Sequence, residues 1–104
     1  MAMPEDDEAL EGQRRHAELK PRYRWRRTGD MFTPDFVGLD GGIKFGRIWP
    51  DEDFAPKERW QWLCTVIMSR TLDCPSKGGA GVARQAARDL EDHYDALKRL
   101  NAAP

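Results

Sequence analysis

The segment Lys20–Arg27 carries the side chains best suited to bind a ligand. Five of its eight residues are cationic, and Tyr23 and Trp25 stand between them. Guanidinium groups bind phosphate through paired hydrogen bonds, and aromatic rings stack on nucleic-acid bases. The segment is therefore either a nucleic-acid-binding strand or an exposed strand whose arginine stems cover the tryptophan ring. The residues expected to contact a ligand are Arg22, Tyr23, Arg24, Trp25, Arg26 and Arg27, together with Arg47 from a later strand.

The charge of the chain changes sign from one segment to the next. Residues 1–13 hold five acids and no base, whereas residues 14–27 hold seven bases and one acid. Residues 28–58 are net acidic again and residues 59–104 are net basic, so the total is −1. The acidic head either shields the basic segment that follows or is ordinary solvated chain. The total charge argues against strong affinity for DNA.

The other reactive side chains lack the neighbours that catalysis or metal binding needs. Cys64 lies in an apolar run and is expected to be a small core residue, whereas Cys74 precedes a proline and has no recognisable base partner. The two cysteines and two histidines show no zinc-ligand spacing. Lys77–Gly81 is rich in glycine but lacks the order of a phosphate-binding loop, and His93 is expected at the surface or at the boundary of the core. We therefore expect no enzyme activity, no cofactor and no bound metal.

The residues that precede the basic segment indicate the cellular compartment. Acids occupy residues 5–8, where a secretory signal would have basic and then apolar residues. No apolar run approaches the roughly 20 residues of a membrane span. We therefore expect a cytoplasmic protein with free thiols and no membrane association.

The hydrophobic pattern predicts strands first and then one helix. Period-two alternation indicates a strand within residues 22–27, and an Asp-Gly turn indicates a hairpin over residues 36–49. Aromatic and β-branched residues predict another strand over 60–68. Residues 71–81 are expected to form a loop, and the apolar spacing over 82–100 predicts an amphipathic helix.

These elements predict an α+β fold. Its antiparallel sheet would have three strands, or four if the 22–27 segment joins, packed against one C-terminal amphipathic helix. Residues 1–20 are expected to be a flexible acidic tail, and residues 21–104 a single sheet-plus-helix domain.

Both faces of this sheet are predicted to carry apolar side chains. The strand at 60–68 turns its tryptophans to one face and Leu63 and Ile67 to the other. One helix covers only one face, so the other needs the N-terminal segment through Tyr23 and Trp25, a second copy of the chain, or another macromolecule. We expect a small non-enzymatic interaction or regulatory domain that binds a protein partner or itself through this face. The alternative is nucleic-acid binding through the basic strand.

Residues 36–100 resemble small bacterial proteins of uncharacterised function. Their layout is a Gly-Arg-Ile-aromatic strand, a Trp-x-Trp strand and a C-terminal helix, matched here by Phe45–Trp49 and Trp60–Trp62. Their helix entry is of a Gly-Arg-Ala type, where this chain has Gly79–Val82. The resemblance implies a compact sheet-plus-helix fold and supplies no activity.

Overall fold

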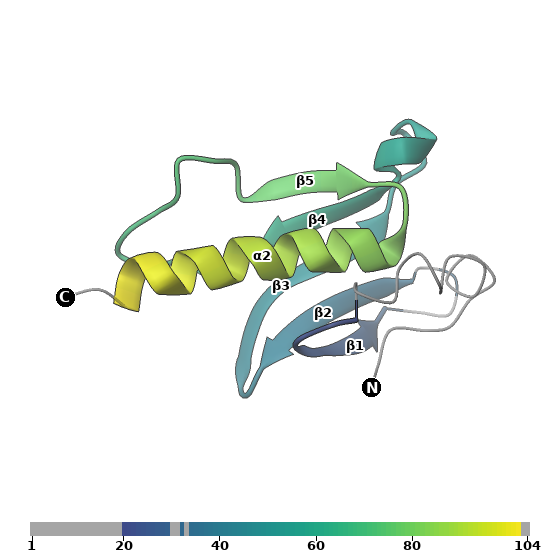
Figure 1. Ribbon diagram of the computed structural model, residues 1–104. Helices are drawn as coiled ribbons and strands as arrows, with labels where there is room; N and C mark the ends of the chain where they lie inside the picture. Colours follow the sequence, from purple (N-terminus) through teal and green to yellow (C-terminus); the bar gives the residue numbers. More distant parts are fainter. Residues whose placement is uncertain (1–19, 30–31, 33, 103–104) are drawn as a thin grey trace.

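A computed structural model describes residues 20–29, 32 and 34–102 of the chain. These residues form a five-stranded antiparallel sheet with one long helix packed on one face (Figure 1). The strands are β1 (Arg24–Thr28), β2 (Asp35–Asp40), β3 (Ile43–Pro50), β4 (Trp60–Cys64) and β5 (Lys77–Ala80). The 3-10 turn η2 (Pro56–Glu58) precedes β4, and the helix α2 (Ala83–Ala102) follows β5.

The strands lie side by side in chain order, and each pairs with the one before it. The predicted α+β layout with one C-terminal helix is confirmed, but the sheet has five strands rather than three or four. The expected loop over 71–81 contains β5, whose sequence Lys-Gly-Gly-Ala has little strand propensity. Gly78 fits there because a Cβ would lie 2.6 Å from Nε1 of Trp62 on the paired strand.

The β2–β3 hairpin turns at the predicted site. Gly41 and Gly42 form the loop, and Gly41 has a positive φ of 58°. The register shifts at Gly38 and Leu39, which leaves Phe45 as an extra residue in β3. The strand predicted over residues 60–68 ends early, at Cys64.

The core lies between the sheet and α2. Ala86, Ala87, Leu90, Tyr94 and Leu97 form the buried stripe of the helix. They pack on the buried sheet residues Trp25, Phe36, Phe45, Ile48, Trp60 and Cys64. Burial of this apolar surface holds the helix on the sheet, and it leaves the other face of the sheet without a helix.

The predicted flexible tail at residues 1–20 falls, apart from Lys20, outside the described residues. Within the described ranges, no helix is both long enough and apolar enough to cross a membrane.

Candidate functional site

The face of the sheet that points away from α2 is called the outer face. Successive side chains of a strand point to opposite faces, and residues paired across strands share a face. Trp25, Phe36 and Ile48 are fully buried on the helix side. Their neighbours along the strands therefore point to the outer face.

One row of the outer face crosses all five strands. The pairing places Arg26 opposite Val37, Val37 opposite Arg47, Arg47 opposite Leu63 and Leu63 opposite Lys77. This central row alternates cation, apolar residue, cation, apolar residue, cation. It combines charge with apolar contact surface in a single line.

Two shorter rows flank the central row. Arg24 pairs with Leu39, and Leu39 pairs with Lys44. On the other side Trp49 pairs with Gln61. The outer face is thus made of Arg24, Arg26, Thr28, Val37, Leu39, Lys44, Arg47, Trp49, Gln61, Leu63, Lys77 and Gly79, with Asp35 at one corner.

Positive charge dominates this face. Its strand residues include five cations and one acid, Asp35. Glu58 of η2 lies at the edge of this face, beside Gly79 and Gln61. Nη2 of Arg47 lies 2.8 Å from Oδ2 of Asp35, and its guanidinium lies 4.3 Å from the centre of the Trp49 ring. The two contacts hold the Arg47 guanidinium over the indole, while 42% of the Arg47 side chain stays exposed.

The structure divides the predicted binding residues between the two faces. Arg24 and Arg26 are exposed on the outer face, and Arg27 pairs with Phe36 on the helix side. Arg22 and Tyr23 precede β1 and reach α2 instead. Arg22 therefore lies apart from Arg24 and Arg26.

Trp25 does not present its ring to a ligand. Its side chain is 1% exposed, and its Nε1 donates a hydrogen bond of 3.0 Å to Glu91. Tyr23 packs beside it against Phe45 and Tyr94. Because both rings lie on the helix side, these two residues do not cover the outer face.

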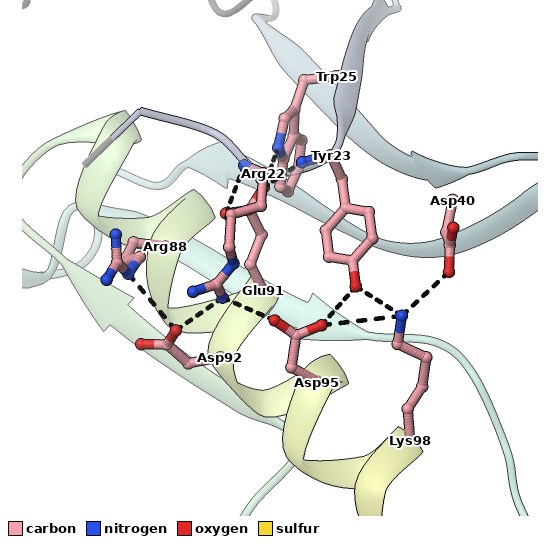
Figure 2. Close-up of polar contacts among 9 residues, drawn as sticks. All are labelled: Arg22, Tyr23, Trp25, Asp40, Arg88, Glu91, Asp92, Asp95 and Lys98. Atoms are coloured by element: carbon pink, nitrogen blue, oxygen red, sulfur yellow. Dashed lines mark hydrogen bonds and ion pairs between the residues drawn. The ribbon is translucent and has the colours of Figure 1, made fainter. Parts of the chain in front are cut away.

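Glu91 explains why the start of β1 turns toward the helix. This carboxylate is fully buried and accepts hydrogen bonds from the backbone amides of Arg22 and Tyr23, at 3.0 and 3.1 Å, as well as from Trp25 (Figure 2). A buried carboxylate needs such donors, because desolvation is costly without them. The segment before β1 is thereby fixed to the middle of α2.

Arg22 extends this anchor to the helix surface. Its Nη2 lies 2.7 Å from Asp92 and 3.1 Å from Asp95, and both acids project from α2 beside it (Figure 2). Burial is the largest single influence on the pKa of Arg22 and would lower it. The hydrogen bond to Asp92 and the nearby acidic charges together outweigh burial, so the pKa is raised. Arg22 is therefore a structural residue.

A second polar cluster closes the far end of the same interface. Lys98 donates to Tyr23 at 2.6 Å and to Asp40 at 3.3 Å, and Tyr94 donates to Asp40 at 2.8 Å. The bond to Tyr23 contributes most to raising the pKa of Lys98, and burial raises the pKa of Tyr94 to about 12. The raised pKa favours the charged form of Lys98, which suits its ion pair with Asp40.

More than half of the outer face was not predicted from the sequence. Val37, Leu39 and Lys44 could have been placed by extending the register of the Gly41–Gly42 hairpin from Arg47. Lys77 had no such signal, because β5 was expected to be a loop. Leu63 was predicted to lie on the face opposite Trp60 and Trp62, and the structure places it on the outer face.

Cys74 has a base partner that was not predicted from the sequence. Its Sγ lies 3.8 Å from Nδ1 of His93, although nineteen residues separate them. The expectation that Cys74 has no base partner was wrong. Within the described ranges, no group of three metal-ligating side chains is close enough to hold an ion.

No protein-family model, curated protein or solved structure matches this chain. The resemblance to small bacterial proteins therefore stays a prediction. What the protein does must be inferred from its own surface.

Proposed function

We propose that the protein binds single-stranded nucleic acid on its outer face. The observation that carries the proposal is the central row, in which Arg26, Arg47 and Lys77 alternate with Val37 and Leu63 across the sheet. The cations suit phosphates, and the apolar residues between them offer contact area to bases and sugars.

Arg47 and Trp49 supply the stacking part of such a site. The guanidinium lies above the indole, 4.3 Å from the ring centre, and donates to Asp35, and both side chains are only partly buried. Arginine planes and aromatic rings are the groups on which unpaired bases stack. This pair takes the role that Tyr23 and Trp25 were expected to fill.

The width of the face favours a single strand over a duplex. Neighbouring strands are about 4.8 Å apart, so the central row spans roughly 19 Å. The major groove of DNA is only about 12 Å wide and cannot take five strands side by side. A flexible single strand can follow the row instead.

A protein partner or a second copy of the chain is the second candidate for the same face. Val37, Leu39 and Leu63 support it, because they are half-buried on a face that α2 does not cover. Against it, every apolar residue in the central row has a cation on each side. Cores of protein interfaces are depleted in charge, whereas phosphate-binding surfaces require it.

The test measures fluorescence anisotropy of a labelled single strand of mixed sequence as protein is added. If the face neutralises about four phosphates, affinity should fall roughly 50-fold between about 50 and 200 mM salt. Arg26→Glu should weaken binding at low salt and flatten the salt dependence. Arg99→Glu is the matched control, because it makes the same charge change at an exposed position of α2.

Three outcomes would overturn the proposal. Absence of binding at low salt would do so, and so would equal losses from Arg26→Glu and Arg99→Glu. A duplex that binds more tightly than the single strand would move the assignment to double-stranded DNA.

A further inference from the structure

A cavity on the helix side of the sheet contains both cysteines of the chain. It has a volume of about 250 Å³ and lies between the β4–β5 connection and α2. Cys64, Cys74 and His93 are its titratable lining residues, and Val66, Leu72 and Leu97 belong to its apolar wall. The outer face, on the other side of the sheet, contributes none of these residues.

The connection that carries Cys74 is tied down at its far side. The backbone amide of Arg70 donates to Oδ1 of Asn101 at 2.9 Å, and Nδ2 of Asn101 donates to the carbonyl of Arg70 at 3.0 Å. The backbone amide of Cys64 also donates to the carbonyl of Ser76 at 2.7 Å. Cys74 thus lies between two anchored points, opposite His93.

His93 is placed to accept the proton of Cys74. Its Nδ1 lies 3.8 Å from Sγ, which is within reach for a thiol donor before a reactant has bound. Its ring is partly buried beside Trp62, at 5.6 Å between ring centres. Burial lowers the pKa of His93, which favours the neutral imidazole. In the tautomer that carries its proton on Nε2, Nδ1 is the atom that accepts the thiol proton.

The two thiols differ in every property that controls reactivity. Cys74 is exposed and faces a base, whereas Cys64 is buried and has its pKa raised by burial. A thiolate attacks disulfides and a thiol does not. Only Cys74 combines access for a reactant with a proton acceptor.

We propose that Cys74 is a reactive thiol that exchanges with small uncharged disulfides held in this cavity. His93 takes the proton from Sγ, and the thiolate attacks one sulfur of the disulfide. The reagent's S–S bond breaks as the new S–S bond to Cys74 forms. The leaving thiolate takes the proton from His93 and departs as a thiol, while the retained half packs against Val66, Leu72 and Leu97.

The test uses dipyridyl disulfide, whose released thione is followed by absorbance, and peptide mass mapping to identify the modified cysteine. In the folded wild-type chain, Cys74 should react before Cys64 and about tenfold faster than the same cysteine in urea-unfolded chain. The charged disulfide cystamine should show less of this acceleration. A folded rate no faster than the unfolded rate would overturn the proposal.

The variant His93→Gln tests whether His93 acts as a base or only supports the local structure. The variant should react about tenfold more slowly at neutral pH and match the wild type at alkaline pH, where the thiol ionises without help. A deficit that persists at alkaline pH, or no deficit at all, would remove His93 from the mechanism. Cys74→Ser should abolish the fast reaction and serves as the blank.

Discussion

Glu91 shows how one residue decides where a whole segment lies. Its carboxylate accepts from three groups of the segment before and within β1, and it is fully buried. In the sequence it is one of several acids in a helix and carries no distinguishing mark. The donors come from residues 22–25, and the sequence does not reveal this long-range pairing.

We predict that Glu91→Gln lowers the free energy of unfolding by about 2–3 kcal/mol. The amide keeps one acceptor oxygen, but its NH₂ group then faces a backbone donor and the charge is lost. Urea denaturation measures the change. Glu58→Gln, at an exposed position of η2, is the control and should change stability by less than about 0.5 kcal/mol.

The bond between Tyr94 and Asp40 predicts a stability that depends on pH. Asp40 accepts hydrogen bonds from Tyr94 and from Lys98. The bond from Tyr94 has the larger effect, and both lower the pKa of Asp40. A carboxyl group whose pKa is lower in the folded chain than in the unfolded chain stabilises the fold when the pH is above its unfolded pKa. This contribution is lost as the pH falls through its folded pKa. Acid should therefore weaken this contact.

Tyr94→Phe tests this sign, because it removes the hydroxyl and keeps the ring, which stacks on Phe45 at 4.4 Å. At neutral pH the variant should be less stable than the wild type by about 1 kcal/mol. The difference should begin to shrink below about pH 4, the ordinary pKa of an aspartate, and should vanish once the pH falls below the lowered pKa of Asp40 in the folded chain. Urea denaturation at both pH values checks it, and a constant difference would contradict it.

At the scale of elements, the contact of α2 with the sheet depends on a glycine. A Cβ at Gly46 would lie 2.4 Å from the carbonyl oxygen of Leu63 and 2.7 Å from Cδ2 of Leu90. The carbonyl belongs to the paired strand and cannot move away without breaking the sheet. The helix and β4 therefore approach β3 only because residue 46 has no side chain.

We predict that Gly46→Ala lowers the free energy of unfolding by about 1–3 kcal/mol through this overpacking. Gly42→Ala is the matched control, since a Cβ there meets no atom within 4 Å and the residue has no positive φ. Thermal unfolding of the two variants makes the comparison. Equal melting temperatures would show that the sheet tolerates the added methyl group.

The elements with strong local patterns were predictable from the sequence. The hairpin followed from its Asp-Gly turn and α2 from its apolar spacing, because both signals lie within a few residues. β5 was not predictable, because Gly78 and Gly79 fit there for a long-range reason. A Cβ at Gly78 would collide with the Trp62 ring, and one at Gly79 would crowd Gln61 and Glu58. The direction of Tyr23 and Trp25 also depended on a distant residue, Glu91.

The candidate site was predictable only in part for the same reason. The basic segment drew attention to Arg24 and Arg26, which do lie on the outer face. Lys44 and Lys77 join them only through strand pairing over long separations. The pairing of Cys74 with His93 likewise depends on where the β4–β5 connection meets α2.

For the whole molecule, the net charge of −1 conceals a separation of charge along the chain, because residues 1–13 alone carry −5. The strand residues of the outer face include five cations and one acid. The helix side holds Asp40, Glu91, Asp92 and Asp95, which pair with Arg22 and Lys98. A weak total charge is therefore compatible with a strongly positive face.

This separation predicts a monomer in the absence of nucleic acid. Two copies joined through their outer faces would bring like charges together, which costs free energy. Light scattering at low salt should give the chain mass of 12.0 kDa. Twice that mass, with dissociation caused by a charge change on the outer face, would favour the second candidate, a face that binds its own copy.

The most direct test of the proposed function is an NMR titration of the labelled protein with a short single-stranded oligonucleotide at low salt. We predict that the amide signals of Arg26, Val37, Arg47, Leu63 and Lys77 and the indole signal of Trp49 shift together. The indole signal of buried Trp25 and the amides of α2 should stay in place. Shifts confined to α2, or no shifts at all, would contradict the assignment of the outer face as a nucleic-acid-binding surface.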